Sequence, residues 1–455
     1  MTKGKLKKKV DLLEKAVNGK LTNQNRFFLE MHLQNIDYLA KQIERFLGHR
    51  SLAEYIKDPL FRNSLFLVLS SVFNAGCGFF FWMIAARMYS LEAVGLATAL
   101  ISSLGLVMLF SRLGFDFSII RFFPAGDKAS IFSTSLVITT AASLLVGAVY
   151  IMLIYLLAPA LVLLREPGYA LVFLSIGAAN SVAAITGNAF VADRKADHFF
   201  LQNIIMALRI PLLIPLVFLG TFGIFSSVGL AYLAASFFAI MTIRKSLMTI
   251  RPEVDWNFMK RSFSFSSWNY VSNILSVAPT LVLPIMILNI LGEAEAAKYY
   301  IASAIGNLVL IIPNSLGTSL LVEGSHGEGL KKSVLRALSA SLVLLVPAVL
   351  VLCLFGDRLL GLLKGDYVEG FNLLRILALS SFMVAFYSLF IPIQNIRMRV
   401  ETVVKLNAIR CMLLLGLSYV LMKQYGILGI GYGWIMTYAV ITLGIGWFAK
   451  REGWI

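Results

Sequence analysis

The sequence contains few charged residues for its length. Of 455 residues, 14% are Asp, Glu, Lys or Arg and 58% are apolar, against about 25% and about 45–50% in an ordinary soluble domain. Length alone would suggest roughly three globular domains, but compact domains cannot bury this much apolar surface. The composition therefore predicts a protein that crosses a membrane many times, and it excludes disordered, collagen-like and disulfide-stapled chains.

Cysteine and histidine are also scarce, with three and four copies. None of them pairs with another ligand-type residue at metal-binding spacing, and the cysteines all lie inside apolar runs. The residues are Cys77, Cys353, Cys411, His32, His49, His198 and His326. We therefore predict no metal, no cofactor and no disulfide framework.

Apolar segments follow one another from Asn63 to the end of the chain. About 20 helical residues cross the roughly 30 Å of hydrocarbon in a bilayer, and backbone polar groups in lipid must bond within their own segment. The predicted fold is therefore all-α, with twelve transmembrane helices. Their ranges are 63–86, 92–111, 131–158, 169–191, 202–220, 223–243, 264–290, 297–321, 334–355, 371–392, 402–421 and 427–449.

The excess of 40 basic over 24 acidic residues, a net charge of +16, would suggest nucleic acid in a soluble protein. In a membrane protein, basic residues instead crowd the cytoplasmic loops. With a cytoplasmic N-terminus, sixteen Lys and Arg residues fall in inside loops and five fall outside, namely Arg87, Arg165, Arg358, Lys364 and Lys423. This bias predicts a multi-pass protein of the cytoplasmic membrane with both termini inside, and no nucleic-acid partner.

Residues 1–58 differ from the rest of the chain because they contain no segment that could span a bilayer and no signal peptide. Apolar residues recur at helical spacing over 27–47, which predicts an amphipathic helix. Two interpretations are open: a cytosolic helix that lies on anionic lipid or on the protein's own loops, or a dispensable extension. The run LTNQNRFFLEMHLQNIDYLAKQIERF resembles a helical stretch of some insertion-sequence transposases, without their catalytic residues, which favours the second.

An internal repeat appears at a spacing of about 200 residues. MYSLEAVG (88–95) matches ILGEAEAA (290–297), FGIFSSVGLAY (222–232) matches YGILGIGYGWI (425–435), and the loops 192–203 and 395–407 fall at the same offset. Six spans per half is an even number, so the halves have parallel topology. We predict a six-helix bundle over 59–243, a cytosolic linker over 244–263 and a second bundle over 264–455.

Polar residues form stripes on four of the predicted spans, at helical spacing that places each set on one face. Such residues often serve close helix packing. Because the stripes fall on equivalent spans of the two halves, we favour a hydrated central cavity. The stripe residues that we select as candidate cavity residues are Asn74, Asn269, Asn273 and Asn307.

Charges near the spans are mostly basic, and each is costly in hydrocarbon unless it faces a cavity or a partner. The basic residues are Arg87, Arg112, Arg209, Lys298, Arg375 and Arg410; the acids, at segment ends, are Glu92, Asp116, Glu293 and Glu401. A cation exporter driven by protons or sodium usually needs a carboxylate at membrane depth. A basic cavity instead suits an anionic head group, because Arg and Lys give charge-assisted hydrogen bonds to phosphate. No catalytic motif is present and the outer loops are short, so we predict no enzymatic activity.

The segment 63–124, with AARMYSLEAVGLATAL and SRLGFDFSIIRFFP, resembles the opening of prokaryotic polysaccharide-biosynthesis membrane proteins. These are oligosaccharide-lipid flippases of the multidrug/oligosaccharidyl-lipid/polysaccharide exporter superfamily. The resemblance implies a V-shaped pair of six-helix bundles around a central cationic cavity. It further implies that a polyprenyl-(di)phosphate-linked oligosaccharide moves from the inner to the outer leaflet by alternating access.

The matching segment contributes Arg87, Arg112, Asp116 and Arg121 to the site, and Lys298 is added from its placement. The substrate-binding candidates are Arg87, Arg112, Lys298, Asn74, Asn269, Asn273 and Asn307, and the structural or gating candidates are Asp116, Arg121, Arg209 and Arg410. Expected partners are the lipid-linked oligosaccharide and membrane lipids, with a glycan polymerase or glycosyltransferases beside them. Two alternatives stay open: a small-molecule or drug exporter, and a non-transporting scaffold of a glycan assembly complex.

Overall fold

The computed structural model describes residues 59–246, 254–325, 330–397 and 399–451. By its internal contacts the chain divides into residues 1–65 and residues 66–455. Of the first unit, only the beginning of one helix is described, so the predicted extension 1–58 and its helix over 27–47 lie outside the described residues. The fold and the candidate site are therefore those of residues 66–455.

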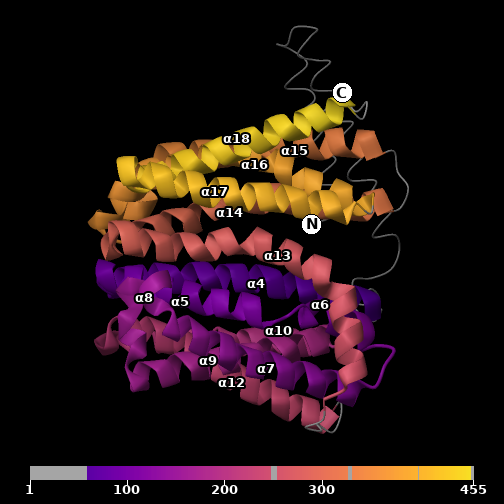
Figure 1. Cartoon of the computed structure of the whole chain (residues 1–455). Helices are drawn as coiled ribbons and strands as arrows, with labels where there is room; N and C mark the ends of the chain where they lie inside the picture. Colours follow the sequence, from indigo (N-terminus) through magenta and orange to yellow (C-terminus); the bar gives the residue numbers. More distant parts are fainter. Residues whose placement is uncertain (1–58, 247–253, 326–329, 398, 452–455) are drawn as a thin grey trace, which may run out of the picture. The chain divides into compact units, whose positions relative to one another are not determined.

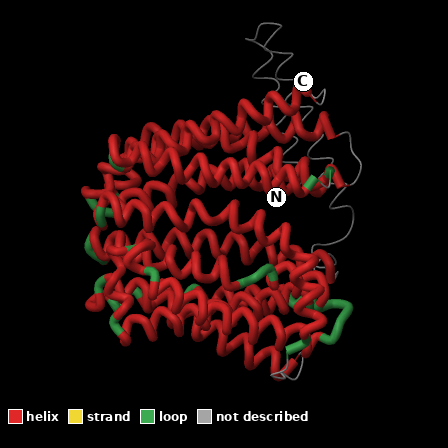
Figure 2. The backbone as a smooth tube through the Cα atoms, viewed as in Figure 1, coloured by secondary structure: helices red, strands yellow, loops and turns green. Residues whose placement is uncertain are grey.

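Every regular element in the described part of the chain is a helix (Figure 2). Eleven of these helices are long and apolar enough to cross a membrane, which agrees with the predicted multi-pass, all-α class. The first lobe contains α4 (Pro59–Met88), α5 (Leu91–Ser111), α6 (Phe115–Phe122), α7 (Lys128–Met152), α8 (Ile154–Leu157), the 3-10 helix η1 (Pro159–Arg165), α9 (Pro167–Ala192), α10 (Ala196–Met206), α11 (Arg209–Leu212), η2 (Val217–Leu219) and α12 (Thr221–Ser246). The second lobe contains α13 (Trp256–Leu291), α14 (Glu293–Ser325), α15 (Leu330–Gly361), η3 (Gly365–Gly370), α16 (Phe371–Ile396), α17 (Val400–Tyr425) and α18 (Ile427–Arg451).

The segment predicted as a single helix over 202–220 is broken in the structure, so this prediction is wrong in detail. It consists of the end of α10, the four-residue α11 and the short η2. The cause is visible in the sequence: Pro211 and Pro215 lie four residues apart. Each lacks an N–H and clashes with the preceding turn. Gly220 then takes a left-handed φ of 55° before α12 begins.

The broken segment nevertheless runs the length of its neighbour α4. The Phe200 ring lies 5.7 Å from that of Phe73, and the Arg209 guanidinium lies 5.5 Å from the Phe81 ring. The Tyr89 hydroxyl, just beyond the end of α4, donates a hydrogen bond of 2.7 Å to the carbonyl of Leu213. The segment therefore runs through the bundle as the other spans do, so the chain makes twelve passages with eleven long helices.

The helix contacts repeat from one lobe to the other, as the sequence repeat predicts. In the first lobe α9 packs against α7 and α12, and in the second lobe α16 packs against α15 and α18. The pairs α5–α7 and α10–α12 correspond in the same way to α14–α15 and α17–α18. Figure 1 shows the two sets as successive groups along the chain, from indigo and magenta to orange and yellow.

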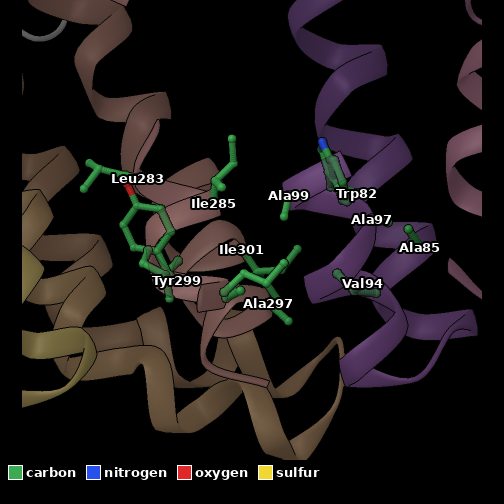
Figure 3. Packing of buried hydrophobic residues seen from close by; sticks show 14 of the residues in the cluster. Trp82, Ala85, Val94, Ala97, Ala99, Leu283, Ile285, Ala297, Tyr299 and Ile301 are labelled. Atoms are coloured by element: carbon green, nitrogen blue, oxygen red, sulfur yellow. The ribbon is translucent and has the colours of Figure 1, made fainter. Parts of the chain in front are cut away.

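The two lobes meet through α5, which packs against both α13 and α14. Glycines in α5 permit this approach: a Cβ atom on Gly95 would lie 1.9 Å from the carbonyl oxygen of Glu293, and one on Gly105 would lie 2.8 Å from the Leu281 side chain. Figure 3 shows the buried side chains that fill this junction, among them Trp82, Ala97, Leu283 and Ile301.

The helix ends fall into two groups, which we name by one residue each. The Tyr89 end contains the connections at 89–90, 158–166, 220, 292, 362–370 and 426, and the Asp193 end contains those at 112–127 and 193–195 together with residues 254, 255, 397 and 399. At the Tyr89 end the lobes are bridged directly: Lys364 Nζ donates to the Tyr89 carbonyl, and Asn289 Nδ2 donates to the Leu157 carbonyl at 3.1 Å.

At the Asp193 end, the hydrogen bonds between the lobes that the structure describes are made by α13 and by Asp255, the residue before it. This helix is bent (Figure 1), and its first part packs on the first lobe. Phe258 lies 6.1 Å from Phe115 between ring centres, and Ser262 Oγ donates to Ser118 Oγ at 2.6 Å. Because α12 extends to Ser246 and α13 begins at Trp256, both helices reach into the predicted linker 244–263.

Candidate functional site

Two cavities with polar walls lie along the faces of α13 and α14. The larger, of about 460 Å³, is lined by residues of α13, α14, α16 and α17 together with Phe117 of α6. The smaller, of about 240 Å³, lies closer to the Tyr89 end, and its walls include Ser102 of α5 and Trp434 of α18. Both cavities therefore touch both lobes.

Three of the predicted cavity residues line these spaces. Asn269 and Asn273 are in the wall of the larger cavity, and Asn307 is in the wall of the smaller. Asn314, one residue of the same stripe, lies seven positions after Asn307 and reaches the larger cavity. The polar stripes of α13 and α14 thus follow both cavities.

Amides and hydroxyls form hydrogen-bonded pairs in the wall of the larger cavity. The Tyr387 hydroxyl donates to Asn407 Oδ1, and Asn407 Nδ2 donates to Ser272 Oγ at 3.0 Å. On the opposite wall, Ser388 Oγ donates to Asn314 Oδ1 at 2.9 Å. No charged side chain of the described residues lines this cavity, so its surface offers neutral donors and acceptors held in fixed positions.

Arg410 lies directly behind this wall, near the middle of α17, with 7% of its surface exposed. Its Nη1 donates to the Tyr438 hydroxyl at 3.1 Å and its Nη2 to the Ser276 carbonyl. The guanidinium also lies 5.0 Å from the centre of the Tyr387 ring. No carboxylate of the described residues pairs with it, and its Nε has no partner. The positive charge is therefore uncompensated.

Arg209 is the counterpart of Arg410 in the first lobe. Aligning Asn203 with Asn407 places Arg209 three residues, about one helical turn, beyond the position equivalent to Arg410. Its guanidinium lies over Phe81 at 5.5 Å, its Nη2 lies 3.9 Å from where a Cβ of Gly78 would be, and its Nε is buried without a partner. Among the described residues it makes neither a hydrogen bond nor an ion pair.

Arg112 and Asp116, which belong to the family-like motif, pair with each other. Leu113 and Gly114 take left-handed φ values of 51° and 79°, which ends α5 and starts α6 one turn later. Arg112 Nη1 then lies 3.3 Å from Asp116 Oδ2, and Asn188 of α9 donates to Asp116 Oδ1 at 2.7 Å. Arg112 therefore joins α5 to α6 beside the larger cavity, with its charge already balanced.

Lys298 is also neutralised. Its Nζ lies 2.7 Å from Glu295 Oε1 and forms a second ion pair with Glu369 of η3. Lys298, in α14, lies beside a part of α5 that is about twelve residues from Arg112. At the rise of an α-helix this is roughly 18 Å. The structure does not bring Arg112 and Lys298 together, so one small head group cannot contact both.

The remaining predicted residues lie outside the cavities. Arg87 is exposed in the last turn of α4 and Arg121 is exposed in the last turn of α6. Asn74 is half-buried in α4 and lines neither polar cavity. Among the described residues, no group of three or more His, Cys, Asp or Glu side chains could hold a metal ion.

Sequence analysis missed the residues that complete the larger cavity from α16 and α17. Tyr387, Ser388 and Asn407 lie on spans that are not among the four with a predicted polar stripe. One signal was available: Asn407 precedes Arg410 by three residues, so the two share a face of one helix.

At the Tyr89 end, burial raises the pKa of the Tyr89 hydroxyl above its usual value. The hydroxyl therefore stays protonated and continues to donate to Leu213. This bond and the Lys364 contact to the Tyr89 carbonyl fix the connection between α4 and α5 on both sides.

Residues 60–322, more than half of the chain, match the polysaccharide biosynthesis protein family. The chain belongs to this family. A curated relative is the uncharacterized membrane protein MJ1375 of Methanocaldococcus jannaschii, which is 24% identical over 361 residues and covers 72% of this chain and 83% of that protein.

The fold is that of two solved transporters. The lipid II flippase MurJ in an inward closed conformation superposes with a TM-score of 0.68, at 15% identity over 85% of this chain and 87% of that chain. The inward-facing conformation of a multidrug resistance MATE family transporter of the MOP superfamily superposes with a TM-score of 0.63, at 17% identity over 83% and 94%. The family match and these two likenesses together place the chain in the polysaccharide biosynthesis protein family, with the helical fold that the two solved structures share.

Proposed function

We propose that this protein carries a polyprenyl-(di)phosphate-linked oligosaccharide from the inner to the outer leaflet of the cytoplasmic membrane by alternating access. The observation that carries the proposal is Arg410, a buried guanidinium that has no carboxylate partner among the described residues and lies beside a polar cavity that touches both lobes. The glycosyltransferases and polymerase of the same glycan pathway would be its partners in the membrane.

An uncompensated arginine at this depth is expensive unless an anion approaches it. A phosphate or diphosphate is the anion that Arg binds best, because its planar fork matches two phosphate oxygens. Arg209 supplies a second uncompensated cation from the first lobe. The phosphate of a lipid-linked sugar would therefore find a cation in each lobe.

The neutral wall of the larger cavity suits the sugars. Hydroxyl groups of an oligosaccharide need donors and acceptors rather than full charges, and the amides of Asn269, Asn273 and Asn314 provide both. A cation exporter would need a carboxylate in this wall, and the described lining has none.

The contacts between the lobes support an alternating-access cycle. Lys364 and Asn289 bridge the lobes at the Tyr89 end. At the Asp193 end, toward which the larger cavity lies, the described bridges come from the beginning of α13 and from Asp255 before it. With both termini in the cytoplasm, as the loop charges predict, the Asp193 end faces the cytoplasm, where lipid-linked sugars are made. Cysteines replacing Gly168, which has open space around it, and the exposed Arg121 test this orientation: only the first should react with an impermeant reagent added outside cells.

The direct test is a flipping assay with the purified protein in liposomes that contain a polyprenyl-diphosphate-linked oligosaccharide. The fraction of sugar accessible to an impermeant lectin should rise with time for the wild type and for Arg375→Ala, because Arg375 is exposed over Phe371. Arg410→Ala should slow flipping about tenfold or more, the effect of losing one charge-assisted bond worth about 1.5–3 kcal/mol. Wild-type protein that fails to flip the lipid but expels cationic dyes would replace the proposal with the exporter alternative.

A further inference from the structure

We infer that the smaller cavity binds a single, electrically neutral pyranose ring of the transported oligosaccharide and selects against acidic sugars. The inference rests on the proposed function, because it names the class of sugar that the transporter accepts. The cavity has a volume of about 240 Å³, below the roughly 300–1,000 Å³ of sites that enclose larger ligands. It therefore suits one ring rather than a chain of several.

The wall of this cavity combines aromatic rings with neutral polar groups. Tyr299, Tyr300 and Trp434 contribute the rings, and Ser102 and Asn307 contribute a hydroxyl and an amide. A pyranose has the same two-sided character, because C–H bonds cover its faces, which pack on aromatic rings, and hydroxyl groups at its edge need donors and acceptors. A hydrocarbon chain would instead leave the hydroxyl and the amide unpaired.

The polar groups of the wall are available to a ligand. Asn307 is exposed and Ser102 is buried, and neither side chain forms a hydrogen bond with any described residue. A backbone acceptor adds to them: Pro284 lies inside α13 and has no N–H, so the Thr280 carbonyl has lost its usual helical donor. Thr280 and Pro284 both line the cavity, which therefore offers an amide, a hydroxyl and a backbone carbonyl.

The charge of the wall separates neutral from acidic sugars. No charged side chain of the described residues lines the smaller cavity. A uronic acid would bring a carboxylate against this neutral wall with no cation to pair it, which is costly. A hexose of the same ring size carries no such charge, and the wall can satisfy its hydroxyl groups. The cavity therefore favours the neutral sugar.

The smaller cavity lies about one helical turn from the arginine that carries the proposed function. On α13, the Ser276 carbonyl accepts from Arg410, and Thr280 in the cavity wall follows four residues, about 6 Å, later. On α18, the Tyr438 hydroxyl accepts from Arg410 at 3.1 Å, and the Tyr438 ring centre lies 5.6 Å from that of Trp434. A sugar bonded to a phosphate at Arg410 would therefore be within reach of Trp434.

A second tryptophan of α18 provides a matched control. Trp447 follows Trp434 on the same helix, is 64% exposed and lines neither polar cavity. Replacing either residue by alanine removes the same indole from the same element. Only the replacement at Trp434 removes a ring from the wall of the smaller cavity.

The test measures the binding of three probes to the full-length protein in nanodiscs: undecaprenyl diphosphate, the same lipid bearing one glucose, and the same lipid bearing one glucuronic acid. Because the two sugars differ only at C6, wild type should bind the glucose probe at least about tenfold more tightly than the glucuronate probe. Trp434→Ala should weaken binding of the glucose probe about three- to tenfold and leave binding of the sugar-free lipid unchanged. Trp434→Phe should retain most of the affinity, and Trp447→Ala should bind as wild type does.

A charge introduced into the wall gives the converse result. Asn307→Lys should raise the affinity for the glucuronate probe about tenfold over wild type, because the ammonium group can pair with the C6 carboxylate. Asn307→Gln, which keeps the amide, should keep the preference for glucose. An Asn307→Lys variant with the preference of wild type would overturn the assignment of charge selection to this cavity.

Equal affinity of wild type for the glucose and glucuronate probes would overturn the inference without any variant having to fold. A loss in Trp434→Ala that extends equally to the sugar-free lipid would also overturn it, and so would the absence of any loss. In each of these cases Arg410→Ala would still weaken the binding of all three probes, and the proposed function would stand. If wild type binds none of the three probes, the proposed function fails and the inference fails with it.

Discussion

The fifth membrane segments of the two lobes occupy equivalent places in the repeat but have different structures. In the second lobe this segment is α17, an unbroken helix of 26 residues. In the first lobe it is the series α10, α11 and η2, broken at two prolines. Each carries one arginine that has no carboxylate partner among the described residues. Arg410 is buried and held by Tyr438 and Ser276, whereas Arg209 is half-buried and rests only against an aromatic ring.

The difference indicates a rigid lobe and a deformable one. Backbone groups of α17 are satisfied within the helix, so the position of Arg410 is set by the lobe's core. The first-lobe segment has lost several helical hydrogen bonds and is held to α4 by side-chain contacts such as Tyr89 to Leu213. We therefore expect Arg209 to move during transport and Arg410 to stay in place.

The largest expected effect comes from removing each arginine in turn. Arg410→Ala should lower the free energy of unfolding by about 1–3 kcal/mol, because the Ser276 carbonyl and the Tyr438 hydroxyl lose a buried partner. Arg209→Ala should cost about 0.5–1 kcal/mol, the worth of an exposed cation–π contact. Thermal unfolding of both variants in detergent measures the contrast. Equal losses would show that the two arginines are held equally firmly.

A smaller effect should follow from repairing the broken segment. Pro211→Ala with Pro215→Ala permits a continuous helix from α10 to η2. Hydrogen exchange of the amides between 207 and 219 should then slow, and flipping should fall a few-fold because the deformable element has become regular. Pro279→Ala in α13 is the control for loss of a helix proline elsewhere. Unchanged exchange across 207–219 would mean that tertiary packing, rather than proline, breaks the helix.

The smallest effect concerns Lys298, where the lobes differ in charge. Its equivalent at the repeat spacing of 202 residues is Leu96, and that of Glu295 is Ala93. Lys298→Leu should destabilise the protein by about 1 kcal/mol, less than for a fully buried pair, because Glu295 is only half-buried and Glu369 is exposed. Adding Glu295→Ala, which copies the first lobe, should recover most of the loss. Chemical denaturation of the single and double variants measures this, and no recovery would indicate that Glu369 is the partner that matters.

Much of the fold could be predicted because membrane helices follow from local hydropathy. Apart from 202–220, the predicted spans coincide with observed helices, and the largest difference at an end is that α13 begins at Trp256 rather than at residue 264. In 202–220, hydropathy alone does not register the break at Pro211 and Pro215. The polar stripes also led to Asn269, Asn273 and Asn307, because a stripe depends only on spacing along one helix. Tyr387 and Asn407 could not be found in this way, since their place in the cavity depends on how α16 and α17 pack.

The sequence by itself determined that this is a multi-pass helical protein with an internal repeat and a shortage of acidic residues within the membrane. Only the tertiary structure decided which basic residues keep an uncompensated charge. Lys298 is paired with a carboxylate 71 residues away, and Arg410 bonds to a serine 134 residues away. Charge compensation depends on the distances between side chains, and helix packing sets those distances for residues far apart in the chain.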